Sequence, residues 1–568
     1  MNTRSFDLHD SNVVTAPNGA RVHKWHLAQS DVITPQFQKV RAGVWCLIGN
    51  GLSNQTFIDA PGGIIAIDTG ESVEEMRDAL KHLRRETDKP IAAVIYSHFH
   101  YVEGTKAVFE EGNHVSPLPI YGHEWIARNK ARSGNEIGPA YSRGLVEQFS
   151  LLLPDDGPDG NVNVGLGFRF RNADHAPFTP GHVPVTHPLR GGECLEIAGL
   201  TVDFDHAPSD CDDSLNMWFR DIGTCVHNSI WPVLFNVFAI RGEEYRDPRV
   251  LIPGIDRIIA WAPEHLVATH GPAVIGKERI REIATRDRDS IQYMWDQTVR
   301  AINKGWTTDE IASRVRLPDM YDVDHFTSER YGVAEHHVRQ IHNGLRGWFD
   351  GDESKLFPLE PAERLGRLID GFGGRAAVAA RATEALDADD VRWALELATW
   401  LVRSDGGSPD ERALLARCLR TVAERTPAAN IRSWCLTHAR HLDGTAPLDR
   451  FYGHAFNPRL IASADPVSLI HTLRVVVEPD LLAGIDHHVA FHVDGAECGL
   501  HVRNHVAVPT NGWGATSLVR MSRETLVGVL AGRRAWSEAV TEGSITVTGD
   551  VAMVDRIRAA VENKGMRS

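Results

Sequence analysis

Three features are scarce in this sequence, and each absence excludes a class of protein. None of the seven cysteines forms a CxxC pair, so no zinc ribbon is predicted, and scattered thiols are typical of a reducing compartment. No apolar run approaches the roughly 20 residues that span a bilayer, and the opening residues lack a signal peptide's apolar middle. The net charge of −15 disfavours nucleic acid and anionic membranes. We expect a cytoplasmic protein with no nucleic acid partner and no membrane insertion.

Short apolar strands alternate with amphipathic helices in residues 1–285. The segment TFIDAPGGIIAIDTG predicts two strands joined by a turn at residues 61–63. Ser72 is placed as the cap of the helix that follows, and residues 90–96, PIAAVIY, predict a buried strand. Strands and helices interleaved in this way indicate an α/β sandwich whose edge loops carry the site.

The rest of the 568-residue chain changes character twice. Residues 286–450 are predicted to be entirely helical, with Thr307 and Glu310 spaced as a capping box. Residues 451–568 alternate apolar and polar side chains at period two and then pass into a helix that begins at Ser522. This last part predicts a small α/β domain, so we expect three domains in all.

Two histidines stand one residue apart directly after the buried strand. Residues two apart in an extended segment point the same way, so His98 and His100 could reach one metal ion. The ordinary alternative is a pair of hydrogen-bonded loop histidines, because the chain has 28 histidines and some pairs arise by coincidence. The preceding strand and Gly104 after the pair favour the metal site.

Several segments carry a resemblance to a known family. The segments IDTG, SHFHYVEG and ATHGP are similar to the metallo-β-lactamase superfamily, and YSRGLVEQFSLLLP, FNVFAIRGEEYRDP and DDVRWALELATWLV resemble its bacterial alkyl sulfatases. The C-terminal VRMSRETLVGVLAGRRAW is similar to a sterol-carrier-like module. The resemblance implies an αββα sandwich in residues 1–285, an all-α dimerisation domain in 286–450 and a sterol-carrier-like α/β domain in 451–568. It therefore implies a homodimer.

The resemblance also implies a ligand set, with changes. His98 and His100 match two ligands of the first metal ion, and His270 matches a late histidine ligand. The aspartate that serves the second metal falls at Val102, which cannot bind an ion, and its histidine partner falls at Glu103, which can. The ordinary reading of Glu103 is a carboxylate that stabilises a helix N-terminus.

Two further positions stay open. In the family an acidic ligand follows an Ala-Pro pair, and here the loop is APSDCDDS, with Asp210 as the best match and Cys211 or Asp212 behind it. The bridging glutamate falls at His227 or Asn228. A solvated acidic loop and a buried, hydrogen-bonded histidine are the ordinary readings of these positions.

The predicted site follows from these matches. Metal ligands are expected at His98, His100, Glu103, Asp210, His227 and His270, with Asp210 and His227 also assigned to catalysis. Substrate contacts are expected at Tyr141, Trp231, Asn236 and Arg241, although Trp231 is also typical of a core and Arg241 of an ion pair. One or two divalent ions are expected. Zinc is most typical of the family, while the altered ligands suit iron or manganese equally well.

Three functions compete. The first is a metal-dependent hydrolase of the sulfatase kind, which acts on an anionic ester of an amphiphilic or alkyl substrate through a metal-activated water. The alternative is a non-heme iron oxygenase or lyase on the same fold, which the replaced ligands favour. The third is a lipid carrier with an inactive site, which the retained histidines disfavour.

Overall fold

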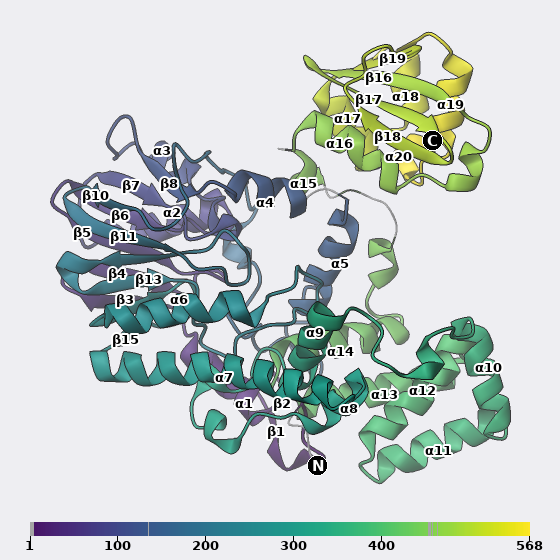
Figure 1. Ribbon diagram of the computed structural model, residues 1–568, viewed down its shortest axis with the longest axis horizontal. Coiled ribbons are helices and arrows are strands. Elements are labelled where there is room, and N and C mark those ends of the chain that lie inside the picture. The colour runs from purple at the N-terminus through teal and green to yellow at the C-terminus, as the bar shows by residue number, and fades with distance from the viewer. Residues whose placement is uncertain (1–4, 134–135, 453–455, 457, 463) are drawn as a thin grey trace. The chain divides into compact units, whose positions relative to one another are not determined.

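The computed structural model describes residues 5–133, 136–452, 456, 458–462 and 464–568. The chain forms two compact units, one of residues 1–126 and 145–447 and the other of residues 127–144 and 448–568 (Figure 1).

The first unit contains two stacked sheets. One sheet has the strand order β3-β4-β5-β6-β7-β8-β9 and the other the order β10-β11-β12-β13-β14-β15. The first sheet comprises β3 (Gln36–Arg41), β4 (Val44–Ile48), β5 (Gln55–Ala60), β6 (Gly63–Ile67), β7 (Ile91–Ile95), β8 (Ile120–His123) and β9 (His187–Leu189). The second comprises β10 (Cys194–Ile197), β11 (Leu200–His206), β12 (Leu215–Phe219), β13 (Thr224–His227), β14 (His265–Ala268) and β15 (Val274–Ile275).

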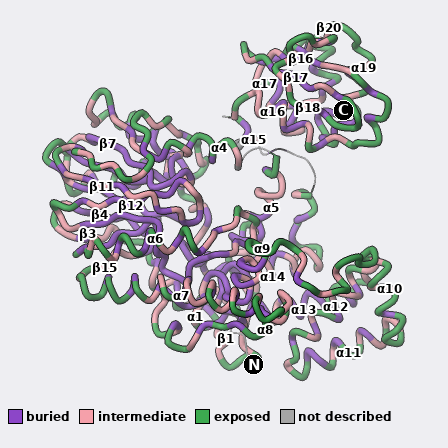
Figure 2. The backbone as a smooth tube through the Cα atoms, in the orientation of Figure 1, coloured by how far each residue is buried: buried purple, intermediate pink, exposed green. Residues whose placement is uncertain are grey.

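Alternating side chains divide each strand between two cores. In β6, Ile65 packs in the core between the sheets, whereas Ile64 packs in the outer core beneath α2 (Val73–Leu83) and α3 (Lys106–Glu111). Similarly, Val226 of β13 faces the core between the sheets, and Cys225 faces α6 (Pro248–Trp261) and α7 (Lys277–Asn303). Buried backbone therefore fills the middle of this sandwich (Figure 2). The predicted αββα architecture is confirmed.

Local sequence signals correctly predicted a turn and a helix cap in the sandwich. β5 ends at Ala60 and β6 begins at Gly63, which matches the predicted turn. Ser72 accepts a hydrogen bond from the backbone N–H of Glu75 at 3.2 Å and caps α2, as predicted. The N-terminal stretch adds β1 (Val13–Thr15), β2 (Arg21–His23) and α1 (Lys24–Val32).

The helical segment belongs to the same compact unit as the sandwich. It comprises α8 (Thr308–Arg314), α9 (Ala334–Arg346), α10 (Pro361–Gly371), α11 (Arg375–Asp387), α12 (Val391–Asp405), α13 (Pro409–Arg425) and α14 (Ala429–Leu442). The capping box of Thr307 and Glu310 forms as predicted. Helix α7 passes without a break through the predicted boundary between residues 285 and 286, whose position stays a prediction. Leu397 of α12 is fully buried in the core of the segment.

The second unit is built on a five-stranded sheet of order β18-β17-β16-β19-β20. Its strands are β16 (His487–Val493), β17 (Ala496–Arg503), β18 (Val506–Thr510), β19 (Ser517–Met521) and β20 (Ile545–Thr548). Helices α15 (Pro458–Ala462), α16 (Pro466–Thr472), α17 (Arg523–Leu530), α18 (Trp536–Thr541), α19 (Val551–Ala559) and α20 (Lys564–Arg567) accompany it, with α4 (Ile126–Ser133) and part of α5 (Gly138–Gln148). Helix α17 begins at Arg523, one residue after the predicted start, and Ser522 is its N-cap.

No membrane-spanning segment was predicted from the sequence. Among the helices that the structure describes, none combines the length and the apolar character needed to cross a bilayer. The likeness of the second unit to a sterol-carrier module stays a prediction.

Candidate metal centre

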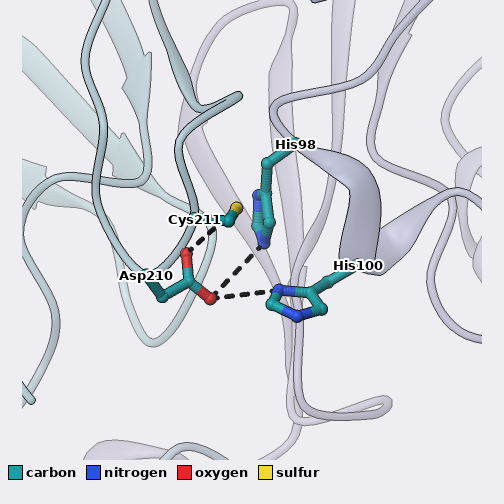
Figure 3. A group of neighbouring side chains, drawn as sticks. All are labelled: His98, His100, Asp210 and Cys211. Carbon is teal, nitrogen blue, oxygen red and sulfur yellow. Dashed lines mark hydrogen bonds and ion pairs between the residues drawn. The ribbon is translucent and has the colours of Figure 1, made fainter. Parts of the chain in front are cut away.

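Four side chains converge where loops from the two sheets meet. His98 and His100 follow β7, and Asp210 and Cys211 lie in the loop between β11 and β12 (Figure 3). One ligand atom from each lies within 4.8 Å of the others, which brings two nitrogen donors, a carboxylate oxygen and a sulfur together. We call these four residues the donor group.

The carboxylate of Asp210 faces both histidines. Its Oδ2 lies 3.1 Å from His100 Nδ1 and 3.8 Å from His98 Nε2. Burial acts to raise the pKa of Asp210, but His98, His100 and the guanidinium of Arg246 outweigh burial and hold that pKa well below its usual value. Asp210 is therefore ionised and supplies the negative charge of the group.

Hydrogen bonds set the proton position on His98. The Ser97 hydroxyl donates to Asp68 Oδ2 at 2.6 Å, so its oxygen accepts from His98 Nδ1 at 2.8 Å. The lone pair of His98 therefore lies on Nε2, which is buried and has no hydrogen-bond partner among the described residues. Burial also lowers the pKa of His98 to about 3, which keeps the ring neutral. A neutral ring oriented by a carboxylate relay is the usual arrangement of a metal-binding histidine.

His270 and His227 are both buried, but their protons are placed differently. His270 Nδ1 donates to the carbonyl of Leu52 at 2.8 Å, so its lone pair lies on Nε2, for which the described part of the chain offers no partner. His227 Nδ1 accepts the backbone N–H groups of Ser229 and Ile230 at 3.2 and 3.3 Å, so its proton lies on Nε2. His270 is thus prepared as a ligand although it lies outside the donor group, whereas the structure does not bring His227 into the group.

Asn228, one of the two candidates for the position of the bridging glutamate, acts as a hydrogen-bond donor to Asp210. Its Nδ2 donates to Asp210 Oδ1 at 2.7 Å and to Ser209 Oγ at 2.8 Å. This amide therefore occupies one oxygen of the carboxylate and directs the other oxygen, Oδ2, at the histidines. An amide nitrogen that donates cannot replace a bridging carboxylate.

Sequence reasoning missed Arg246. This buried arginine donates from Nε to the carbonyl of Asp210 at 3.2 Å and from Nη1 to the carbonyl of Asn236 at 2.6 Å. It ties the loop of the donor group to the segment that follows β13. The available signal was its place in the segment GEEYRDP, within a stretch that carried the family resemblance.

Glu103 and Asp212 are not brought into the donor group. Glu103 Oε2 accepts the backbone N–H of His182 at 3.1 Å, so its carboxylate is directed at the loop before β9. Val102 is fully buried in the outer core of the first sheet. Asp212 contributes its backbone carbonyl, which accepts from His206 Nε2 at 2.6 Å. Of the three candidates in the acidic loop, the group therefore contains Asp210 and Cys211.

The predicted substrate residues are spread over the chain. Trp231 is buried, donates from Nε1 to the carbonyl of Asn228 at 3.1 Å, and packs edge-on against His270 as a wall of the site. Asn236 is buried, and Arg241 forms an ion pair with Glu243. Tyr141 lies in the part of α5 that belongs to the second unit. The roles of these residues stay predictions.

Comparison with known proteins identifies the family. Two family models match, metallo-beta-lactamase superfamily over residues 48–101 and alkyl sulfatase dimerisation over residues 307–445. A linear primary-alkylsulfatase from Pseudomonas sp. is 36% identical over 393 residues, which cover 68% of this chain and 73% of the relative. An (R)-specific secondary-alkylsulfatase from Pseudomonas sp. is 26% identical, with 93% and 80% covered.

A solved structure agrees in fold. The stereoselective inverting sec-alkylsulfatase Pisa1 from Pseudomonas sp. matches 98% of this chain and 90% of its own, with a TM-score of 0.83 at 22% identity. The sandwich and its site thus define a protein of the metallo-β-lactamase superfamily. Within that superfamily, the chain belongs to the alkylsulfatase family, as the sequence resemblance predicted.

The metallo-β-lactamase fold implies a divalent ion, and the donor group fits one. His98 has a buried Nε2 that meets no partner in the described ranges, and His100 turns its Nδ1 toward the ionised carboxylate of Asp210. Two nitrogens, one carboxylate oxygen and one sulfur are donors that zinc accepts, and a zinc ion can expand from four to five ligands, which leaves room for a water molecule. His270 is prepared to contribute as well.

Proposed function

We propose that this protein is a metal-dependent hydrolase that cleaves the sulfate ester of an alkyl or amphiphilic alcohol. The observation that carries the proposal is the orientation of His98. Hydrogen bonds from His98 through Ser97 to Asp68 leave the lone pair on Nε2, which faces the carboxylate of Asp210. This arrangement stands in a chain whose relatives named above are alkylsulfatases. None of those relatives is an oxygenase or a lyase, so they give no support to the hypothesis of a non-heme iron oxygenase or lyase.

The contacts of each site residue support a specific role. A bound divalent ion would supply Lewis-acid chemistry and lower the pKa of a water molecule. His98, His100 and Asp210 hold this ion, with His270 as a further ligand. Asn228 holds the side chain of Asp210 and Arg246 holds its backbone carbonyl, so protein contacts fix the position of the carboxylate charge. Zinc is the metal that we propose.

The anionic head of the substrate needs cationic or amide donors nearby. We assign this part to Arg241 and Asn236, both on the segment that follows β13, and Trp231 would exclude water from the histidines. The alkyl chain would extend away from the ion. All seven cysteines are free thiols, which supports a location in the cytoplasm.

The function is tested by supplying the zinc-loaded protein with linear primary and secondary alkyl sulfates. We expect release of inorganic sulfate and of the corresponding alcohol, with no consumption of dioxygen. Ion chromatography and an oxygen electrode measure the two quantities. Dioxygen uptake without sulfate release would instead support the oxygenase hypothesis. If neither sulfate release nor dioxygen uptake occurred, the hydrolase proposal would be contradicted.

We further propose a homodimer that forms through the helical segment, which the alkyl sulfatase dimerisation model matches. Trp348 is 67% exposed and Phe357 90% exposed, and burial of such side chains in a partner is favourable. Light scattering at micromolar concentration should give twice the mass of one chain, and the double change Trp348→Ser and Phe357→Ser should lower it. Trp513→Ser, at an equally exposed site in the second unit, is the matched control. A monodisperse monomer of the parent protein would contradict the proposal.

A further inference from the structure

The fourth member of the donor group is a thiol, and the family resemblance assigns no thiol to this site. We propose that Cys211 binds the ion as a thiolate, together with His98, His100 and Asp210. This inference rests on the proposed metal centre and specifies its ligands. It replaces Glu103, the carboxylate that the sequence predicted as a ligand.

The position of the sulfur supports ligation. All four ligand atoms already lie within 4.8 Å of one another. Ligands of a tetrahedral zinc ion are about 3.3–3.8 Å apart, given metal–ligand bonds of about 2.0–2.3 Å. Small side-chain rotations therefore suffice to close the group around one ion. Figure 3 shows the sulfur beside the His98 ring, on the side where the carboxylate also lies.

The present contacts of the sulfur are weak. Cys211 Sγ lies 3.7 Å from Asp210 Oδ1 and 3.5 Å from Ser214 Oγ. A thiol is a poor donor and acceptor, so little is lost when these contacts are exchanged for a metal bond. The Asn228 amide donates to Asp210 Oδ1 at 2.7 Å, and ligation by Cys211 leaves that hydrogen bond intact.

A second and independent observation points to a ligand at this place. His98 is fully buried, and its Nε2 is directed into the donor group with no hydrogen-bond partner in the described part of the chain. A buried nitrogen of this kind costs free energy unless something binds it. An ion shared with Cys211 and Asp210 satisfies the nitrogen.

Sulfur ligation changes the choice of metal. When the ion binds, the S–H bond breaks, the sulfur keeps the electron pair for the metal, and the proton leaves to solvent. Thiolates are soft ligands that select zinc or cobalt over manganese or magnesium. Ligation by Cys211 therefore favours zinc or cobalt, whereas a Glu103 ligand would favour a harder metal.

Cobalt(II) tests the inference without any reference to activity. Metal-free full-length protein is titrated with Co²⁺ and its absorption is recorded. Ligand-field bands in the visible report that the ion is bound, and a sulfur-to-cobalt charge-transfer band in the near ultraviolet reports a thiolate ligand. We expect both in the parent protein. In Cys211→Ser we expect loss of the charge-transfer band, with ligand-field bands retained at higher Co²⁺ concentration.

Two further variants make the outcome unambiguous. Cys194→Ser removes an exposed thiol outside the donor group and should keep both sets of bands. Cys211→Asp keeps a ligand at the position, so it should bind Co²⁺ without the charge-transfer band even if the serine variant misfolds. Ligand-field bands without charge transfer in the parent, or charge transfer that survives in Cys211→Asp, would overturn the thiolate and leave the metal centre standing. The absence of all bands in the parent would overturn both.

Discussion

Replacing His98 with alanine is expected to remove the bound metal and the hydrolase activity together. The side chain is fully buried, and Asp68 acts through Ser97 to hold its proton on Nδ1, which leaves the lone pair on Nε2. Loss of this ligand leaves an incomplete set, and metal affinity depends steeply on a complete set. Elemental analysis of protein purified without chelator should fall from about one ion per chain to the background.

A matched control separates ligand loss from general damage. Glu103→Gln changes a predicted ligand on the same loop but keeps its shape, and its carboxylate contacts the backbone of His182 rather than the donor group. This variant should keep its metal and its activity, with at most about 1 kcal/mol lost in stability. Full metal occupancy in His98→Ala would mean that His98 is an ordinary loop residue. Loss of metal in Glu103→Gln would restore Glu103 as a ligand.

Asp210→Asn should lower metal affinity by more than the roughly 10–100-fold typical of losing a residue that only supports a ligand. The substitution preserves shape but removes the one charge that faces both histidines at 3.1 and 3.8 Å. The hydrogen bond from Asn228 can persist, because the new amide retains one oxygen. Competition with a chromophoric zinc chelator measures the affinity of parent and variant under the same conditions.

The neighbouring Asp212→Asn is the control for charge. It removes the same charge from the same loop, but Asp212 lies outside the donor group and contributes a backbone carbonyl to His206. Metal affinity should therefore stay close to that of the parent. If both variants lost affinity equally, the loop would act through its net charge and not through a specific carboxylate.

Much of the fold could be predicted from the sequence because its signals are local. The turn before Gly63, the cap at Ser72 and the capping box at Thr307 depend on residues a few positions apart, and all three are found. The pair His98 and His100 was predicted from its spacing in an assumed extended segment, but β7 ends at Ile95 and His100 lies in a short 3-10 helix of residues Phe99–Tyr101.

The remaining features of the site depend on contacts between distant segments. His270 is prepared as a ligand by a carbonyl 218 positions away, and Asp210 is held by Asn228 and Arg246 from two other segments. The direction of the Glu103 side chain is set by the backbone of His182. A single sequence shows none of these pairings. Residue type and spacing therefore indicated a set of candidates, and the fold brings Cys211, but not Glu103, into the donor group.

Helix α7 has a consequence for how the first unit responds to stress. It contains 27 residues, so it is about 40 Å long, and its side chains pack in one core with the outer face of the second sheet and with α9. Helix α7 also packs against α8 and α9, so it joins the sandwich to the start of the helical segment. Thermal or mechanical unfolding of either part therefore breaks the same helix. The metal site and the proposed subunit contact should accordingly be lost in a single cooperative step, so loss of the partner subunit and loss of the catalytic centre would share one temperature.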